Sequence, residues 1–481
     1  MNRGTVLRLL TAASAFLLIP VLVSAQSQQR AVPPADATRA QIQSASEEER
    51  ARELKLLGVS ALRPGVSARD PAAPNFANFD EANANPFPDL PPLLKTVAGK
   101  DVTTPAAWWK MRRPEIARLL DSNLYGRVPE HVPAVTWRVT ETVQENVGSI
   151  PVETRKLTGH VDNAAAPAIT VDLLMTVTVP VAARRKHVPS VMLFGSTDPH
   201  PRPLSAYGIS EPDGPSEREQ VIAKGWAVVV LDPSSVQADN AAGLTQGIIG
   251  LVNKGQPRSL NDWGALRAWA WGAGRGLDYL ATDPDVDAGR VAIFGHSRYG
   301  KAALVTLAYD QRFATGYISS SGAGGATLYR RNYGEGIPNL AAANEFHWFA
   351  GNFLQFAAVG RSAADMPVDA HELIAMVAPR SVFIGGGALM LSPPEVVPGD
   401  AWTDTPGMFK AAVAASPAWT LLGRKGLADA SPPPPLACLT AGDIGFRQHQ
   451  YGHTPKPNWP CFIQFASKYF ERPSAAKGSG R

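Results

Sequence analysis

The stretch "GHSRYGK", residues 295–301, decides the fold that the sequence predicts. The apolar run "RVAIF" (290–294) precedes it, and "AALVTLAYD" (302–310) follows it. A short continuous apolar run is typical of a buried parallel strand, and the second run has helical spacing. The chain therefore places a serine, an arginine and a lysine in a tight turn between a buried strand and a helix.

Similar apolar runs recur along the chain and alternate with helical patterns. The predicted strands cover residues 190–195, 226–232, 290–295, 315–322, 381–387 and 435–441, and the predicted helices cover residues 105–129, 262–283, 301–310, 371–379 and 459–471. Residues 134–180 carry alternating, Val- and Thr-rich stretches that indicate antiparallel strands before them. This order predicts an α/β fold with a doubly wound, mostly parallel sheet in a three-layer αβα sandwich.

Within such a sheet, residues 295–301 resemble the G-x-S-x-G nucleophile elbow of the α/β-hydrolase fold. Gly295 and Ser297 keep the pattern, whereas Tyr299 stands in the last glycine position and Gly300 follows it. The turn would lift the Ser297 hydroxyl above the carboxyl edge of the sheet, where such folds bind ligands. A glycine-rich turn with a capping serine is the alternative, but the flanking strand and helix favour the elbow.

A serine nucleophile needs a general base, and the base needs an acid that orients it. The histidines downstream of the serine are His347, His371, His449 and His453. In this fold the base follows the last strand, which leaves His449 and His453, and we favour His453. Their H-x-x-x-H spacing also occurs in zinc sites, but Gly452 and Pro455 oppose a helix, so we expect no metal.

The acid should follow the predicted strand at residues 381–387, where the loop offers Glu395, Asp400 and Asp404. Loop carboxylates are usually solvated, so position alone does not choose among them. Asp369 is an outside candidate, and capping the next helix is its favoured role.

The elbow is similar to that of the glucuronoyl esterases, carbohydrate esterase family fifteen, and above all to the bacterial branch, in which it reads G-C-S-R-x-G-K. This chain keeps every fixed position except the cysteine, which His296 replaces. The resemblance extends to "WWKMRRPEIARLLDSNLYGRVP", "SGAGGATLYRRNYGE", "GDAWTDTPGMFKAAVAASPAWTLLG" and "GHTPKPNWPCFIQFASKYF". It covers about residues 85–471 and implies an α/β-hydrolase fold.

The resemblance implies that Ser297 is the nucleophile and His453 the general base. Some members of the family carry the acid directly before an S-G-x-G-G turn, where this chain has Ser320. Other bacterial members carry it in a D-x-W turn, which here is Asp400 with Trp402. Asp400 is therefore the expected acid.

The resemblance also implies roles for the polar residues around the elbow. Arg298 would stabilise the oxyanion, and Lys301, Glu335 and Trp402 would hold the hydroxyls and face of a uronic acid ring. A surface salt-bridge pair is the alternative for Arg298 and Lys301.

The implied activity is that of a serine-type carboxylic ester hydrolase without a cofactor, which cleaves glucuronoyl (4-O-methyl-glucuronate) esters of plant xylan, such as lignin–carbohydrate esters, through an acyl-enzyme. The closest alternative is an acetyl xylan esterase or other carboxylesterase with the same triad. A secreted peptidase is disfavoured, because no propeller-like repeats precede the catalytic region. A carbohydrate-binding protein with a damaged triad is the non-enzymatic alternative, since Ser320 has replaced one acid.

The first residues have the pattern of an export signal. Arg3 and Arg8 precede the apolar "LLTAASAFLLIPVLV", and the small residues of "VSA" come directly before Gln26. A membrane anchor is the alternative, but the run is short and contains Pro20. We expect a signal peptide at residues 1–25 and a secreted or periplasmic protein without a membrane segment after cleavage.

The remaining boundaries and partners follow from composition. Residues 26–75 predict a flexible arm or linker with one short helix, 76–472 a single catalytic domain, and 473–481 a disordered tail. Net charge is +4 with scattered basic residues, so no nucleic acid is expected. We expect a monomer that acts on a uronic-acid-bearing polysaccharide. Cys438 and Cys461 either pair or remain thiols.

Overall fold

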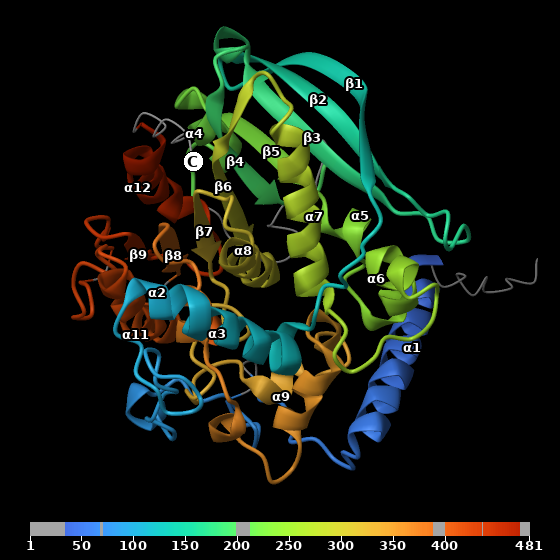
Figure 1. The fold of residues 1–481 in the computed structure, drawn as a ribbon, viewed down its shortest axis with the longest axis vertical. Helices are drawn as coiled ribbons and strands as arrows, with labels where there is room; N and C mark the ends of the chain where they lie inside the picture. Colours follow the sequence, from blue (N-terminus) through green and yellow to red (C-terminus); the bar gives the residue numbers. More distant parts are fainter. Residues whose placement is uncertain (1–33, 68–70, 199–211, 388–399, 435, 472–481) are drawn as a thin grey trace, which may run out of the picture. The chain divides into compact units, whose positions relative to one another are not determined.

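A nine-stranded sheet forms the centre of the computed structural model, which describes residues 34–67, 71–198, 212–387, 400–434 and 436–471 (Figure 1). The strands are β1 (Val135–Val147), β2 (Ile150–Val161), β3 (Asp172–Pro180), β4 (Val188–Phe194), β5 (Ala227–Leu231), β6 (Val286–His296), β7 (Thr315–Ser319), β8 (Val382–Gly386) and β9 (Ile444–Gln448). Their order is β1-β2-β3-β5-β4-β6-β7-β8-β9. The pairs from β1 to β5 are antiparallel, and those from β5 through β4 to β9 are parallel.

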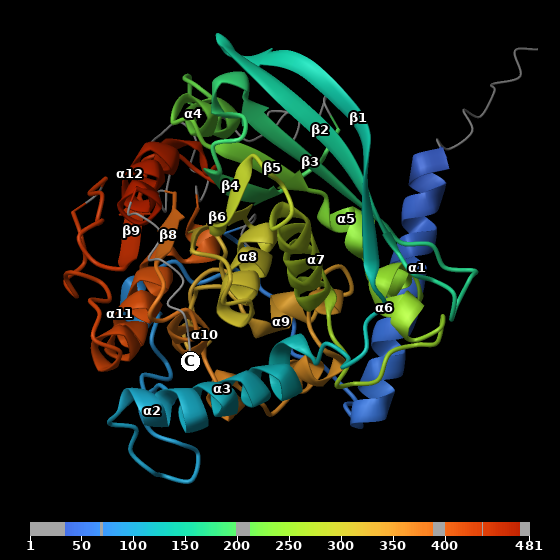
Figure 2. The same ribbon diagram turned by 45° about the horizontal axis from the view of Figure 1, so that its top comes forward.

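The parallel strands are apolar because helices cover both of their faces. Alternate residues of β6 show this: Ile293 packs into one core, whereas Ala292 and Phe294 pack into the other. The first core includes α7 (Ala265–Leu280), α8 (Arg298–Tyr309), α10 (Ala370–Ala375) and α11 (Thr405–Leu421), and the second includes α4 (Glu217–Ala223) and α12 (Trp459–Phe470) (Figures 1 and 2). The predicted three-layer αβα sandwich is confirmed.

The other helices are short apart from the first. They are α1 (Pro34–Leu57), α2 (Pro105–Ala107), α3 (Arg113–Leu120), α5 (Pro233–Val236), α6 (Gly247–Val252) and α9 (Ile337–Leu340). Within the described ranges, none of the helices combines the length and apolar composition that crossing a bilayer requires.

The last predicted strand is wrong. It was predicted at residues 435–441, of which 436–441 are described; these form no strand of the sheet, and Leu439 makes only an isolated bridge to Phe446 in β9. Four consecutive prolines precede this apolar run, and proline lacks the N–H that a ladder needs. The observed strand β9, "IGFRQ", ends in polar residues. It therefore lacks the continuous apolar run from which the other parallel strands were predicted.

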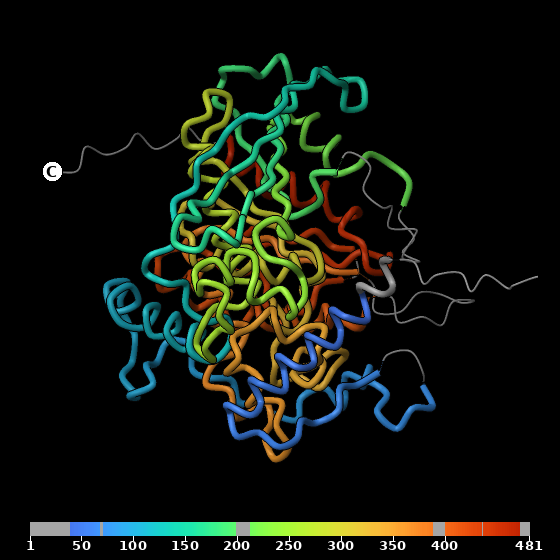
Figure 3. Tube along the Cα trace, turned by 90° about the vertical axis from the view of Figure 1, so that its right-hand side faces the viewer, coloured from blue at the N-terminus to red at the C-terminus, as the bar shows by residue number. Residues whose placement is uncertain are grey.

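A long helix, α1, lies in the segment for which the sequence predicted an arm or linker with one short helix. Contacts divide the chain into residues 1–41 and 42–481, and within the second unit residues 42–57 of α1 are anchored by a buried ion pair. Glu53 Oε1 lies 2.7 Å from Arg258 Nε, and both side chains are fully buried. Arg50 of α1 donates to the Ala341 carbonyl, and Figure 3 shows the blue helix lying against orange segments of the chain. The sequence predicted a helix in this segment but not the buried ion pair that anchors it. The predicted signal peptide and tail lie outside the described residues.

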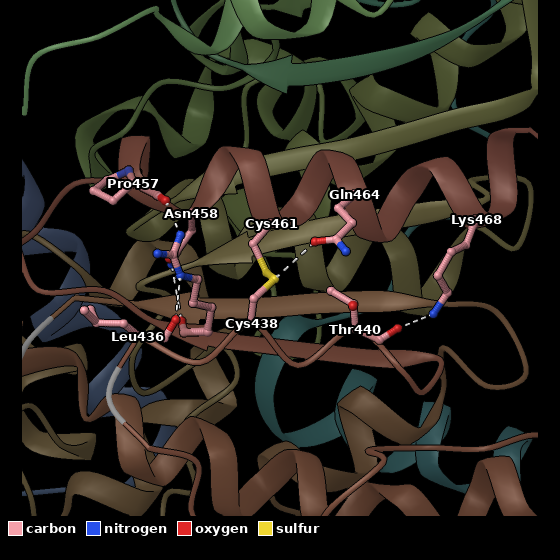
Figure 4. The surroundings of a disulfide bond; sticks show 9 residues. Leu436, Cys438, Thr440, Pro457, Asn458, Cys461, Gln464 and Lys468 are labelled. Atoms are coloured by element: carbon pink, nitrogen blue, oxygen red, sulfur yellow. Dashed lines mark hydrogen bonds between the residues drawn. A yellow bond between two sulfur atoms is a disulfide. The ribbon is translucent and has the colours of Figure 1, made fainter.

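A disulfide joins Cys438 to Cys461 and settles the question that the sequence left open (Figure 4). It connects the segment before β9 to α12. Nearby, Arg447 donates to the Pro457 carbonyl and Lys468 to the Thr440 carbonyl. The bridge thus ties together the two ends of the region that contains β9 and the loop with His453.

Candidate active site

Ser297 stands between the end of β6 and the start of α8, as the elbow pattern predicted. Its φ is 59° and its ψ is −128°, in the left-handed half of conformational space that few non-glycine residues occupy. Its N–H donates to the Ser319 carbonyl at 2.9 Å, which ties the turn to β7. The constrained backbone holds the side chain at the carboxyl edge of the sheet.

The displaced glycine of the elbow has a packing reason. A Cβ at Gly300 would lie 2.7 Å from the Ser319 carbonyl oxygen, so α8 can pass β7 only with glycine there. Tyr299 instead directs its ring to Trp269, with 5.4 Å between ring centroids. In this chain the helix comes closest to β7 at residue 300, one position later than in the usual pattern, so the glycine is needed at residue 300.

Asp400 and His453 lie in direct contact. Asp400 Oδ1 is 2.7 Å from His453 Nδ1, and the carboxylate is fully buried. Because an ionised carboxylate only accepts, His453 Nδ1 carries the proton and Nε2 is left as the acceptor in the neutral ring. This is the arrangement of a base with its orienting acid.

Two further donors hold the other oxygen of Asp400. Ser320 Oγ donates to Oδ2 at 2.5 Å and the Gly387 N–H at 2.6 Å. Burial raises the pKa of Asp400, but the charge and hydrogen bond of His453, with those of Ser320 and Gly387, outweigh it and leave the pKa below its ordinary value. Asp400 is therefore kept ionised.

Gly387 also makes room for the histidine loop. A Cβ there would lie 2.3 Å from the Gly452 carbonyl oxygen. The end of β8 can thus touch both Asp400 and the loop of His453 only because this residue has no side chain.

His453 is placed beside the elbow by His296, which directly precedes Ser297. The two imidazole rings are tilted, with 4.3 Å between their centroids. His296 Nδ1 lies 3.0 Å from Ser319 Oγ, and burial, followed by the charge of His453, holds the pKa of His296 well below its ordinary range. The structure thus brings the nucleophile candidate, the histidine and the aspartate to one edge of the sheet.

The other downstream histidines are buried and have partners of their own. His449 Nε2 lies 2.7 Å from the Thr454 carbonyl oxygen, His347 Nε2 3.0 Å from Asp239 Oδ1, and His371 Nε2 3.0 Å from the Pro91 carbonyl oxygen. Burial lowers the pKa of His449 to about 4.

The rival carboxylates also have structural partners. Asp404 Oδ2 is 2.6 Å from Arg331 Nε, with both side chains buried, and it caps α11. Asp369 caps α10, as the sequence predicted, and pairs with Arg330 at 3.1 Å. Glu395 lies outside the described residues. Among the described carboxylates that the sequence offered, Asp400 alone contacts His453.

The Lys301 ammonium forms its hydrogen bonds with groups of the protein. Its Nζ donates to the Ser321 carbonyl at 2.8 Å, the Ala323 carbonyl at 2.6 Å and Glu335 Oε1 at 2.8 Å. An ammonium has three N–H donors, so these contacts use all of them. The Glu335 N–H in turn donates to the Trp402 carbonyl at 2.9 Å. Lys301 therefore fixes Glu335 beside Trp402.

Arg298 is half-exposed and pairs with a residue that the sequence did not single out. Asp239 Oδ2 lies 2.5 Å from Arg298 Nε. Burial lowers the pKa of Arg298, but the charge of Asp239 outweighs burial and leaves that pKa raised. Burial raises the pKa of Asp239, but its bonds and charges with His347, Arg298 and Trp348 leave that pKa lowered, so both groups remain charged. Asp239 follows β5 by a few residues, and the rule that sites lie at carboxyl ends of strands was the one signal that could have found it.

The described residues contain no group of three or more His, Cys, Asp or Glu side chains placed to hold a metal ion.

Comparison with known proteins relates the chain to one group of enzymes. A family described as "Glucuronyl esterase, fungi" matches residues 177–423. A structure of a CE15 glucuronoyl esterase from Teredinibacter turnerae is 40% identical, with a TM-score of 0.79, over 88% of this chain and 99% of that one. A protein named as a carbohydrate esterase, from an unknown prokaryotic organism, is 29% identical over 83% of this chain and 93% of its own length. A 4-O-methyl-glucuronoyl methylesterase from Hypocrea jecorina is 30% identical over 33% of this chain and 34% of its own length.

Proposed function

Since the chain belongs to the glucuronoyl esterase family and is a carboxylic ester hydrolase, we propose that Ser297, His453 and Asp400 are its catalytic triad. The observation that carries the proposal is the contact between buried Asp400 and His453 beside the elbow. We further propose that the substrate is an ester of glucuronic acid or its 4-O-methyl derivative, as the names of the relatives indicate.

In the proposed mechanism, His453 Nε2 takes the proton of Ser297 Oγ as the oxygen attacks the ester carbonyl. The tetrahedral intermediate collapses when His453 returns that proton to the leaving alcohol, and the glucuronoyl group stays on Ser297 as an ester. Water then attacks the acyl-enzyme by the same proton transfers and releases the uronic acid. Asp400 keeps its charge and stabilises the imidazolium in both steps.

Arg298 is the proposed oxyanion donor. Its Nε lies beside Asp239, and its Cζ lies 5.0 Å from the centroid of the Tyr299 ring. In the proposal, a terminal nitrogen of the guanidinium donates to the developing charge. The residue opens α8, so its backbone N–H also lies at a helix N-terminus, where negative charge is stabilised. Donors aimed at the transition-state oxygen accelerate ester hydrolysis more than donors that bind the ground state.

The sugar ring is proposed to bind Glu335 and Trp402. Glu335 can accept from ring hydroxyls through its second carboxylate oxygen, and the indole of Trp402 offers a flat apolar face. Lys301 acts in this proposal by holding Glu335, because its own donors are occupied. The alcohol part of the ester is proposed to be a plant cell-wall component.

The disulfide and the predicted signal peptide support a secreted or periplasmic location. We propose that the protein acts there as a monomer on polysaccharide. A direct test compares hydrolysis of benzyl glucuronate, acetylated xylan and 4-nitrophenyl acetate by the purified protein. Preference for benzyl glucuronate is expected, whereas release of acetate from xylan at a higher kcat/KM would replace the proposed substrate by an acetyl ester.

Asp400→Asn is expected to lower kcat by roughly 10²- to 10⁴-fold with little change in KM. The substitution keeps the shape but removes the charge that fixes the His453 tautomer and stabilises the imidazolium. Steady-state kinetics on benzyl glucuronate measure the loss.

Asp404→Asn and Asp369→Asn are the matched controls. Each weakens a buried ion pair, which costs stability rather than chemistry, so melting temperature should fall while kcat per folded molecule changes little. If either control loses more kcat than Asp400→Asn while folded, the acid is misassigned.

Substrate discrimination should separate the sugar-binding residues from the oxyanion residue. Glu335→Ala and Trp402→Ala are expected to lower kcat/KM on benzyl glucuronate more than about 10-fold, and on 4-nitrophenyl acetate far less, because acetate has no ring to contact. Arg298→Ala should lower both by roughly 10²-fold, which corresponds to the loss of about 3 kcal/mol from one oxyanion donor. Equal losses on both esters for all three variants would refute the proposed glucuronate site.

A further inference from the structure

Asp239 collects donors from two separate parts of the chain. Its Oδ1 accepts from Trp348 Nε1 at 2.6 Å and lies 3.0 Å from His347 Nε2, while its Oδ2 faces Arg298 Nε. Because the carboxylate only accepts, His347 carries its proton on Nε2. One oxygen of the Asp239 carboxylate is therefore bound by Trp348 and His347, and the other oxygen pairs with Arg298.

Rigid elements support both donors and Asp239 itself. The neighbouring Gln237 is fully buried; its Oε1 accepts from the Ile249 N–H and its Nε2 donates to the Gly243 carbonyl. These bonds fix the loop that carries Asp239. His347 and Trp348 lie in a short 3₁₀ turn, Phe346–Trp348, that continues into Phe349. The Phe349 carbonyl accepts from buried Arg258 at 2.7 Å, and Arg258 is paired with Glu53 of α1.

A guanidinium on a long side chain samples many rotamers when it is half-exposed, and losing that freedom on reaching the transition state has an entropic cost. One ion pair at Nε restricts the rotation of the guanidinium, and the terminal nitrogens carry its other four N–H donors. Preorganised donors of this kind stabilise a transition state without reorganisation.

We propose that Asp239 is a positioning residue for catalysis: anchored by His347 and Trp348, it orients the Arg298 guanidinium toward the oxyanion. The inference rests on the proposed role of Arg298 and adds the residue through which that role is prepared. His347 and Asp239 form a second aspartate–histidine pair beside the triad, and here the histidine is buried and serves as an anchor.

The test is a double-mutant cycle with Asp239→Asn and Arg298→Ala, measured on benzyl glucuronate and 4-nitrophenyl acetate. In the parent, Asp239→Asn should lower kcat by about 10-fold on both esters and change KM by less than about 3-fold, since the oxyanion is common to both. In the Arg298→Ala background, the same substitution should change kcat by less than about 2-fold.

An equal loss in both backgrounds would overturn the proposal, because Asp239 would then act independently of Arg298, as a merely structural residue does. Unchanged kcat for folded Asp239→Asn, with a large loss for Arg298→Ala, would overturn it while the oxyanion role of Arg298 stood. If Arg298→Ala itself left both esters unaffected, the proposed oxyanion role would fail and this inference with it. The three results are distinct.

A second variant guards against a folding defect. Trp348→Phe keeps the aromatic ring and removes only the N–H donor to Asp239, so a loss of about 3-fold is expected in the parent and none in Arg298→Ala. In ¹⁵N NMR spectra of the intact protein, the Arg298 guanidinium should rotate slowly about its Nε–Cζ bond, and it should rotate faster in Asp239→Asn because the ion pair is lost. Equally slow rotation in the variant would contradict the proposed anchoring.

Discussion

Ser297→Ala is expected to lower kcat/KM for benzyl glucuronate by on the order of 10³-fold or more. In the proposed mechanism the acyl-enzyme forms on Ser297 Oγ, and alanine offers no atom to carry it. The loss should fall on kcat, with binding of the sugar preserved, because the proposed sugar-binding residues Glu335 and Trp402 are unchanged. Single-turnover experiments should detect no acyl-enzyme in the variant.

Ser320→Ala provides the matched control for Ser297→Ala. It deletes a neighbouring buried hydroxyl that donates to Asp400, while His453 and the Gly387 N–H still contact that carboxylate. A loss of less than about 10-fold is expected, in line with one hydrogen bond to a charged group. Activity of Ser297→Ala within tenfold of the parent, in protein free of contaminating esterase, would refute the triad.

His453→Gln is expected to have an effect as large as that of Ser297→Ala. Glutamine can occupy the space but has no ring nitrogen to accept and return the serine proton, so kcat should fall by on the order of 10³-fold or more. Combining it with Ser297→Ala should add little further loss, since triad members act as a unit. Kinetics of the two single variants and the double variant measure this.

His449→Gln is the control from the same loop. His449 is buried and bonded to the Thr454 carbonyl, and a glutamine amide can keep that bond. The melting temperature should therefore move more than kcat does. A larger loss of kcat in His449→Gln than in His453→Gln, with both variants folded, would exchange their assigned roles.

Elements whose sequence signals act over a few neighbouring residues could be predicted, whereas contacts between distant segments could not. The elbow, the parallel strands from β4 to β8 and the helices α7, α8, α10 and α12 were predictable, because apolar periodicity and turn residues act over a few positions. The strand β9 was missed because it ends in polar residues. A short helix was predicted within residues 26–75, but the buried ion pair that anchors it was not.

Around the site, the sequence named the candidates but did not pair them. Asp400 and Asp404 are loop carboxylates of the same kind, and resemblance rather than spacing favoured Asp400. In the tertiary structure Asp400 contacts His453, whereas Asp404 contacts Arg331. The Lys301 ammonium was expected to reach a sugar, and the structure shows its three donors engaged by the protein.

By itself, the sequence determined that a serine stands in a tight turn after a buried strand of a mostly parallel sheet, with a histidine loop downstream. Only the tertiary structure decided which carboxylate meets which cation, including the pairing of Asp239 with Arg298. The physical reason is that a charged side chain carries no local pattern that names its partner. Its pairing depends on burial and on approach within a few ångströms, and both arise only when distant segments pack together.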